Sequence, residues 1–335
     1  MSKRAEPFQK LGYRLNWTTG DTSERNSRVK MIDIFDDLVL THNEGNSVAA
    51  RDLASGQVRW SANLGNPLTK FNGNVRLGDR IIASSESELL ILDAKTGNLE
   101  DRQRLAVLSN TAPGIADQYM LIYGSARGEV FGHDTRVGLK RWGFALNDRV
   151  NGNPVVMGRI AGAVAESGQV LLVNPITGEA IAPLQQIYGG VVNNPVSDGV
   201  NMYIASTDQS IYAFESTTGE LRWRVRTQSP LEAQPAVYDG ALYQYVPSEG
   251  MIAVNTRTGK RLWTNDEVDG TVIAVRKGNL VVFNGSEMML LDPASGDIRE
   301  RVAVPGVRKI AIDGFVDGNL VVLSGNSALA RFSSF

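Results

Sequence analysis

The sequence predicts an all-β fold, an eight-bladed β-propeller in which each blade has four strands. Three markers predict it, and all recur with a period of about 41 residues, the length of a propeller blade. The first is a turn glycine, at positions 56, 97, 138, 178, 219, 259 and 296. The second is a proline 24 residues before that glycine, at Pro154, Pro195 and Pro235, whereas Pro113 deviates from this spacing by one residue. The third is a polar turn near positions 84–88, 125–128, 166–168, 207–209, 248–250 and 285–287.

The composition agrees with a single domain over residues 1–335. Of the 335 residues, 34 are glycine, and these mostly separate short runs of Val, Ile, Leu and Tyr, as strands and turns require. No convincing helix is found. Residues 1–10 are expected to form a flexible N-terminal segment, and the polar residues 20–28 a mobile loop.

Charge and residue usage exclude several classes of function. The 34 basic and 36 acidic residues are interspersed, with a net charge of −2, so no basic stripe predicts nucleic-acid binding. Cysteine is absent, which excludes disulfides and thiolate chemistry. No apolar run reaches the 18 residues or so that a membrane span needs, and Met1–Lys10 lacks the apolar stretch of a signal peptide. The protein is therefore either cytoplasmic or the processed form of an exported chain.

One repeat unit shows how the four strands arise. Pro235–Tyr238 is the first strand, and the Asp239–Gly240 pair after it is a hairpin signal. Ala241–Tyr245, Met251–Asn255 and Lys260–Thr264 follow as the second, third and fourth strands. Seven such units fill about residues 30–300.

The eighth blade is expected to combine both ends of the chain. Three strands follow the last complete unit, at Ile310–Asp313, Asn319–Ser324 and Ser327–Phe332. Residues 12–17, which end in Trp17, resemble a fourth strand. The N-terminal strand is thus predicted to join the C-terminal blade and to remove its free edge.

Tryptophan marks the fourth strand of most blades. Trp60, Trp142, Trp223 and Trp263 each lie four residues after the turn glycine, and Trp17 has the corresponding place in the closing strand. These five are predicted to pack against a neighbouring blade. Asp101, Ala182 and Glu300 stand at the same position in the other three blades.

The repeat apolar–apolar–Asp–x–x–Thr–Gly–x–x–x–Trp resembles the Trp-docking motif of pyrroloquinoline-quinone-type (PQQ-like) propellers, over nearly the whole chain. Two branches of that group matter. One is the quinoprotein dehydrogenases, which are longer enzymes that bind calcium and carry a cysteine disulfide beside the quinone. The other is the BamB family of outer-membrane assembly lipoproteins, which is also eight-bladed and about this long.

The residues favour the second branch. The chain has no cysteine, its tryptophans are assigned to docking positions, and its turn acids come singly from different blades. No cofactor, metal site or catalytic group is therefore predicted. A quinone-dependent dehydrogenase, a small-ligand-binding propeller and a generic structural or self-assembling propeller stay open as alternatives.

In the BamB family, Leu and Arg residues in the loop entering the fourth blade contact the barrel-assembly partner. The resemblance places Leu146 and Arg149 at two of these positions, whereas Asp148 replaces a second leucine. The next loop carries paired acids in the family but reads Tyr-Gly-Gly from Tyr188 here. Tyr188 is either an apolar anchor for a partner or a residue of ordinary blade packing.

Propeller topology also places a set of turn residues on the face that carries Arg149 and Glu232. They are Glu44, Glu86, Arg127, Glu166, Asp208, Glu249 and Glu287. They form either a charged rim that orients a partner or ordinary solvated turns. His42 and His133 are expected to be structural rather than ligands or catalytic bases.

The predicted function is a non-catalytic, protein-binding scaffold of the bacterial cell envelope, periplasmic or envelope-associated, without a transmembrane segment. The predicted partner-binding residues are Leu146, Arg149, Tyr188, Glu166, Asp208, Glu232 and Glu249.

Overall fold

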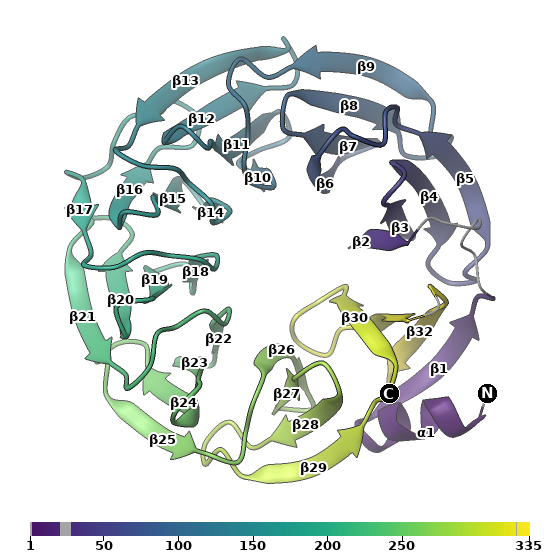
Figure 1. Ribbon diagram of the computed structural model, residues 1–335, viewed down its shortest axis with the longest axis vertical. Helices are drawn as coiled ribbons and strands as arrows, with labels where there is room; N and C mark the ends of the chain where they lie inside the picture. Colours follow the sequence, from purple (N-terminus) through teal and green to yellow (C-terminus); the bar gives the residue numbers. More distant parts are fainter. Residues whose placement is uncertain (1, 21–27, 326) are drawn as a thin grey trace. The chain divides into compact units, whose positions relative to one another are not determined.

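The computed structural model describes residues 2–20, 28–325 and 327–335, and within them it has eight four-stranded antiparallel sheets (Figure 1). These are the blades of a β-propeller, so the predicted fold class is confirmed. By its internal contacts the chain divides into two units. One comprises Met1–Thr69, Lys95–Asn98 and Glu267–Phe335, and the other Lys70–Ala94 and Leu99–Asp266. Each is described by itself.

The first unit holds three blades. One consists of β2 (Val29–Phe35), β3 (Leu38–Asn43), β4 (Ser47–Asp52) and β5 (Val58–Asn63). The second consists of β26 (Thr271–Arg276), β27 (Asn279–Phe283), β28 (Glu287–Leu291) and β29 (Ile298–Ala303). The third has the order β1 (Tyr13–Thr18), β32 (Leu329–Ser334), β31 (Leu320–Ser324) and β30 (Val307–Ile312).

The second unit contributes the strands of the remaining five blades. They are β6 (Phe71–Leu77), β7 (Arg80–Ser85), β8 (Glu88–Asp93) and β9 (Leu99–Arg104); β10 (Gly114–Ile115), β11 (Met120–Gly124), β12 (Glu129–Asp134) and β13 (Leu139–Ala145); β14 (Val155–Met157), β15 (Ile160–Val164), β16 (Gln169–Val173) and β17 (Gln185–Gln186); β18 (Val196–Ser197), β19 (Asn201–Ser206), β20 (Ser210–Glu215) and β21 (Leu221–Arg226); and β22 (Ala236–Tyr238), β23 (Ala241–Val246), β24 (Gly250–Asn255) and β25 (Arg261–Asn265). The middle strands of each blade are almost wholly buried, as in β19 and β20.

The closing blade forms as predicted. β1 pairs with β32 in antiparallel register, from Tyr13 opposite Ser334 to Thr18 opposite Ala330. Arg276, at the end of β26, supports this closure. Its Nε donates to the carbonyl of Gly12 (3.0 Å), its Nη1 bonds Asp317 Oδ1 (2.5 Å), and its Nη2 donates to the carbonyl of Phe335. One buried guanidinium thus holds three segments that are remote in sequence.

The expectation that the chain has no convincing helix is wrong at residues 2–10. Helix α1 (Ser2–Lys10) occupies them and contacts β1 and β29. Phe8 is buried and stacks on Phe332 with ring centroids 4.1 Å apart, and Leu11 is buried beside it. The sequence pattern missed this helix because it is short, polar on average and stabilised by these few apolar contacts. The predicted mobile loop 20–28 falls mostly on residues 21–27, which lie outside the described residues.

The tryptophans contact the next repeat along the chain. Indole Nε1 donates to a carbonyl from Trp17 to Leu53 (2.9 Å), from Trp142 to Pro175 (3.0 Å) and from Trp223 to Thr256 (2.8 Å). The turn glycine of that repeat lies against the ring, so a Cβ on Gly178 would be 2.5 Å from Trp142 Cγ. The glycine is therefore needed for its close approach as well as for its φ of +77°.

In the blade where Asp101 stands in place of the tryptophan, another side chain makes the contact with the next blade. Gln103, two residues later, donates from Nε2 to the carbonyl of Thr135 (2.7 Å), at the register where the other blades accept an indole N–H. Gln103 Oε1 accepts from His133 Nε2 at 2.9 Å. Both His133 and Gln103 are buried. The expectation that His133 is structural agrees with these contacts.

The prolines have a structural consequence that the periodicity alone did not reveal. The inner strands that follow Pro113, Pro154, Pro195 and Pro235 have only two or three residues, because proline cannot donate to a strand partner. The residue before each proline instead forms a ladder. Asn153 Oδ1 accepts from Ala112 N (2.9 Å), Asn194 Oδ1 from Asn153 N (2.8 Å) and Gln234 Oε1 from Asn194 N (3.1 Å). Side-chain amides thus link four successive blades where strand pairing is short.

A third repeated feature lies at the Thr-Gly turn. Ion pairs join the acid four residues before the glycine to an arginine three residues after it: Asp52 with Arg59 (2.5 Å), Asp134 with Arg141 (3.2 Å), Glu215 with Arg222 (3.1 Å) and Asp292 with Arg299 (2.6 Å). In two blades an asparagine replaces the acid and an apolar residue replaces the arginine: Asn174 occurs with Ile181, and Asn255 with Leu262. Asn174 Oδ1 still accepts backbone N–H groups of the turn, as Asp52 Oδ1 does. The amide thus keeps the turn without an arginine partner.

Among the residues described, no helix is long and apolar enough to cross a membrane.

Candidate partner-binding surface

Loops and turns of the second unit interlock into a continuous surface, which we call the loop face. It comprises residues 146–153, 165–168, 187–194, 206–210, 227–232 and 246–250. Backbone hydrogen bonds join each loop to the turn beside it: Glu166 N to Arg149 O (2.8 Å), Thr207 N to Gly190 O (3.0 Å) and Leu231 N to Ser206 O (3.2 Å). At the end of the series Gln228 N donates to Glu249 Oε1 at 2.7 Å. These bonds hold the loops in fixed positions before any partner arrives.

The first of these loops presents Arg149. Its Nε bonds Glu166 Oε2 at 2.9 Å, while 58% of its side-chain surface is exposed. The same carboxylate oxygen accepts from Asn151 Nδ2 at 2.8 Å, and Ser167 Oγ donates to Asn147 Oδ1 at 2.5 Å. The guanidinium is thus oriented on one side and open to solvent on the other.

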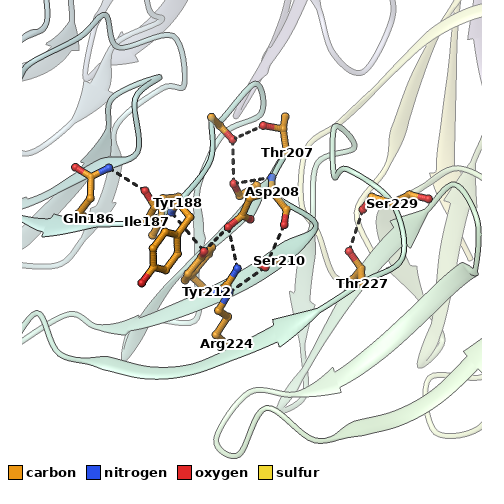
Figure 2. Close-up of polar contacts among 12 residues, drawn as sticks. Gln186, Ile187, Tyr188, Thr207, Asp208, Ser210, Tyr212, Arg224, Thr227 and Ser229 are labelled. Atoms are coloured by element: carbon orange, nitrogen blue, oxygen red, sulfur yellow. Dashed lines mark hydrogen bonds and ion pairs between the residues drawn. The ribbon is translucent and has the colours of Figure 1, made fainter.

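The next loop presents Tyr188, which is 85% exposed although it is a large aromatic residue. Figure 2 shows its ring beside Tyr212 and Arg224. The Arg224 Cζ lies 5.1 Å from the centroid of each tyrosine ring, within the range of a cation–π contact. Tyr188 N donates to Tyr212 Oη at 3.5 Å. Tyr188 is therefore an exposed aromatic held in place by its neighbours.

Asp208 lies beneath this pair and organises it. Its Oδ2 accepts from Tyr212 Oη and, at 3.1 Å, from Arg224 Nη2, while Arg224 Nε donates to Ser210 Oγ at 3.0 Å (Figure 2). Burial, followed by the hydrogen bond to Asp208, raises the pKa of Tyr212, so its hydroxyl stays a donor at neutral pH.

Two glycines let the Tyr188 loop approach this closely. A Cβ on Gly189 would lie 2.5 Å from Asp208 Cβ and 2.7 Å from its backbone nitrogen. A Cβ on Gly190 would lie 3.2 Å from the carbonyl oxygen of Glu166. The Tyr-Gly-Gly sequence stands where the family has paired acids. Its two glycines allow the loop to pack directly against the turns that contain Asp208 and Glu166.

The other predicted site residues lie in different surroundings. Leu146 is 7% exposed and packs in the core. Its N–H bonds Gly128 O, and the same contact recurs at Leu64, Leu105 and Ile187, all buried. Leu146 thus occupies a packing position of the repeat. Glu232 is exposed on the loop face.

Glu249 is nearly buried and bonds Arg261 Nη1. Burial alone raises the pKa of its carboxyl, but the Arg261 guanidinium and the Gln228 N–H together outweigh it and hold the pKa below its ordinary value. Glu249 thus stays ionised as part of the fold. Of the wider predicted rim, Glu44 and Glu287 belong to the other unit.

Sequence reasoning missed Tyr212 and Arg224. Tyr212 reads as an ordinary apolar residue of a buried strand, and Arg224 is one of many arginines beside the docking tryptophans. Only the fold brings both to Tyr188.

Within the described residues, no group of three or more His, Asp or Glu side chains is arranged to hold a metal ion. His42 Nε2 lies 3.2 Å from Asn46 Oδ1, and both residues are buried.

Comparison with known proteins gives three findings. A family model described as "Outer membrane protein assembly factor BamB" matches residues 12–144, 45–190 and 166–333. The crystal structure of BamB from Moraxella catarrhalis superposes with a TM-score of 0.72 and 18% identity, covering 93% of this chain and 97% of that one. The computationally designed Ika8 protein superposes equally well, with a TM-score of 0.72 and 13% identity over 93% of this chain and 97% of that chain. At these identities the two structures show the fold alone.

A curated relative is the tetrathionate hydrolase of Acidianus ambivalens, 28% identical over 149 residues. The match covers 37% of this chain and 28% of that protein, so it spans less than a third of the relative's length.

Proposed function

Because the chain belongs to the family of the outer membrane protein assembly factor BamB, we propose that it is a non-catalytic scaffold of the bacterial cell envelope. In this proposal it is periplasmic or envelope-associated, and it binds a protein of outer-membrane assembly through the loop face. The observation that carries the proposal is Tyr188, an aromatic residue that is 85% exposed, whose ring contacts Arg224 and whose backbone N–H bonds the Tyr212 hydroxyl.

Such a residue has the properties of an interface anchor. A few hot-spot residues supply most of the binding energy in protein interfaces, and these are enriched in Trp, Tyr and Arg. An anchor that is already ordered loses little conformational entropy on binding. Arg149, on the neighbouring loop, adds an oriented charge that favours fast and specific association. The interlocked loops hold the two residues on one rigid surface.

Photo-crosslinking in cells tests the proposal. A photoreactive phenylalanine analogue replaces Tyr188 in the full chain, and the products are identified by mass spectrometry. We expect a crosslink to a protein that takes part in outer-membrane assembly. The control places the analogue at Arg159, which is exposed in the turn between β14 and β15 and lies outside the loop face.

The crosslink should weaken when Arg149→Glu is added to the photoreactive variant. Products that are the same from positions 188 and 159, or that contain no envelope protein, would contradict the proposed function.

The similarity to tetrathionate hydrolase favours one second candidate, an enzyme acting on tetrathionate. Incubation of the purified protein with tetrathionate, followed by assay of thiosulfate and sulfate, tests it directly. No turnover above a heat-inactivated control would remove this candidate.

A further inference from the structure

The loop face and the blades around it share a pattern of charge that the sequence did not predict. In five successive blades of the second unit a carboxylate pairs with a basic side chain: Glu88 with Arg102 (3.7 Å), Glu129 with Lys140 (2.6 Å), Glu166 with Arg149 (2.9 Å), Asp208 with Arg224 (3.1 Å) and Glu249 with Arg261. The acids all lie in or next to the turn between the second and third strands.

In every pair the base is the more exposed partner. The exposed side-chain fraction is 55% for Arg102 and 22% for Glu88, 31% for Lys140 and 25% for Glu129, and 58% for Arg149 and 36% for Glu166. It is 29% for Arg224 and 12% for Asp208, and 34% for Arg261 and 5% for Glu249. Three of these acids, Glu166, Asp208 and Glu249, were predicted to belong either to a charged rim that orients a partner or to ordinary solvated turns. The structure places Asp208 and Glu249 beneath their arginines, so the outward charge at these pairs is positive.

Tyr188 and Val192 share one loop of the loop face, and the elements next to this loop carry two arginines, Arg149 in the preceding loop and Arg224 on β21. Val192 is 56% exposed, and Gly190 between them contacts the turn of Glu166, whose carboxylate orients Arg149. Arg224 contacts the Tyr188 ring. Two exposed apolar side chains thus belong to a loop that contacts Arg224 and the turn of Glu166, and Arg224 and Arg149 are each already paired with a carboxylate.

From this arrangement we propose that the loop face binds an acidic protein segment that also carries an apolar or aromatic side chain. Carboxylates of the segment bond the open sides of the Arg149 and Arg224 guanidiniums, and the apolar side chain packs on Tyr188 and Val192. Guanidinium groups accommodate carboxylates with two parallel hydrogen bonds. The proposal rests on the proposed function for its biological setting, and it specifies the chemistry of the partner.

A display library of random 12-residue peptides, selected on the immobilised full chain, tests the proposal. We expect enrichment of peptides in which Asp or Glu flanks an aromatic residue or leucine. Affinity for a synthesised winner should fall at least tenfold with Tyr188→Ala and with Arg149→Ala, and it should weaken as salt rises. Arg159→Ala, which removes the same charge outside the loop face, should leave affinity unchanged.

Arg224→Lys is the second variant, since it keeps the charge and the pair with Asp208 but loses the planar group over Tyr188. It should weaken binding several-fold without lowering the melting temperature. Enrichment of basic peptides, no enrichment at all, or acidic peptides that bind the Tyr188→Ala variant unchanged would overturn the inference, and so would preferential binding of RNA or inorganic phosphate.

The two experiments separate the two proposals. Crosslinking to an assembly protein together with selection of basic peptides leaves the proposed function standing and refutes the acidic partner. Selection of acidic peptides without any envelope crosslink does the reverse.

Discussion

Gln103 shows how a single residue replaces an indole at a blade contact. The amide Nε2 reaches the carbonyl of Thr135, which corresponds to the carbonyl acceptors of Trp17, Trp142 and Trp223. It cannot fill the volume of a tryptophan, and His133 completes the contact from the third strand of the neighbouring blade. Burial lowers the pKa of His133, so the imidazole is neutral when it donates to Gln103. A lapse in the tryptophan pattern is thus compensated by a buried polar pair.

Gln103→Ala should destabilise the protein by about 1–3 kcal/mol, because it leaves a buried carbonyl and a buried imidazole without their partner. Urea denaturation of the variant and of the parent chain measures the change in the free energy of unfolding. Gln57→Ala, at an exposed side chain, is the matched control and should change it by less than about 0.5 kcal/mol. Equal effects at the two positions would show that the Gln103–His133 pair contributes nothing.

At the scale of one element, an aspartate at the Thr-Gly turn makes two kinds of contact, one with the turn backbone and one with an arginine. One carboxylate oxygen accepts the backbone N–H groups of the turn, and the other pairs with an arginine of the outer strand. Asn174 and Asn255 make only the first kind of contact, and in both blades an apolar residue stands at the arginine position. In these two blades the acid and the arginine are thus lost together, whereas a third blade keeps Asp93 with Glu100 at the arginine position.

Asp52 makes a pH-dependent contribution to stability. The hydrogen bond from Arg59 lowers its pKa from 3.8 to about 2. The carboxylate is ionised in both the folded and the unfolded chain at neutral pH, so its stabilisation is fully present above pH 3.8. As the pH falls towards 2, the unfolded chain binds the proton first and the stabilisation is lost.

Asp52→Asn should therefore cost less than about 1 kcal/mol at pH 7, because both side chains are partly exposed and solvent screens the pair. The cost should shrink as the pH falls from about 4 to about 2, as followed by urea denaturation at each pH. Asp36→Asn, in the neighbouring hairpin turn, is the control. A cost that grows on acidification would contradict the sign of this argument.

At the scale of the whole molecule, the closing blade depends on Arg276. Its side chain is only 6% exposed and joins Gly12, Asp317 and Phe335. It also lies 5.7 Å from the ring centroid of Tyr13, whose pKa burial raises to about 12. A buried charge with several partners is costly to remove, because those partners are then left unpaired.

Arg276→Met should lower the free energy of unfolding by about 3–5 kcal/mol. Chemical denaturation measures it, with Arg308→Met, at an exposed position of β30, as the control. A double-mutant cycle with Asp317→Asn should give a favourable coupling energy of about 1 kcal/mol or more. Additive effects of the two substitutions would mean that the ion pair does not contribute to closure.

Much of the fold follows from the sequence because it is periodic. A repeat position that is apolar, glycine or proline in unit after unit identifies the strands, and the expected closing strands differ from β30, β31 and β32 by a few residues at most. Helix α1 does not repeat, so periodicity could not reveal it. The candidate site was predicted only in part for a related reason. Arg149 could be singled out by the family resemblance, whereas the stacking of Arg224 on Tyr188 depends on side chains whose contacts no repeat specifies.

The joining of β1 to β32 has a consequence for how the protein is made. The Thr19 hydroxyl accepts from the backbone of Leu329, 310 residues later. A ribosome therefore releases β1 and the apolar residues beside it long before their partners exist. Phe8, Leu11 and Tyr13, which are buried in the finished protein, stay without their final neighbours while seven blades are synthesised. Their late docking makes closure a step of high contact order, and a short apolar segment stays without its final contacts until synthesis is nearly complete.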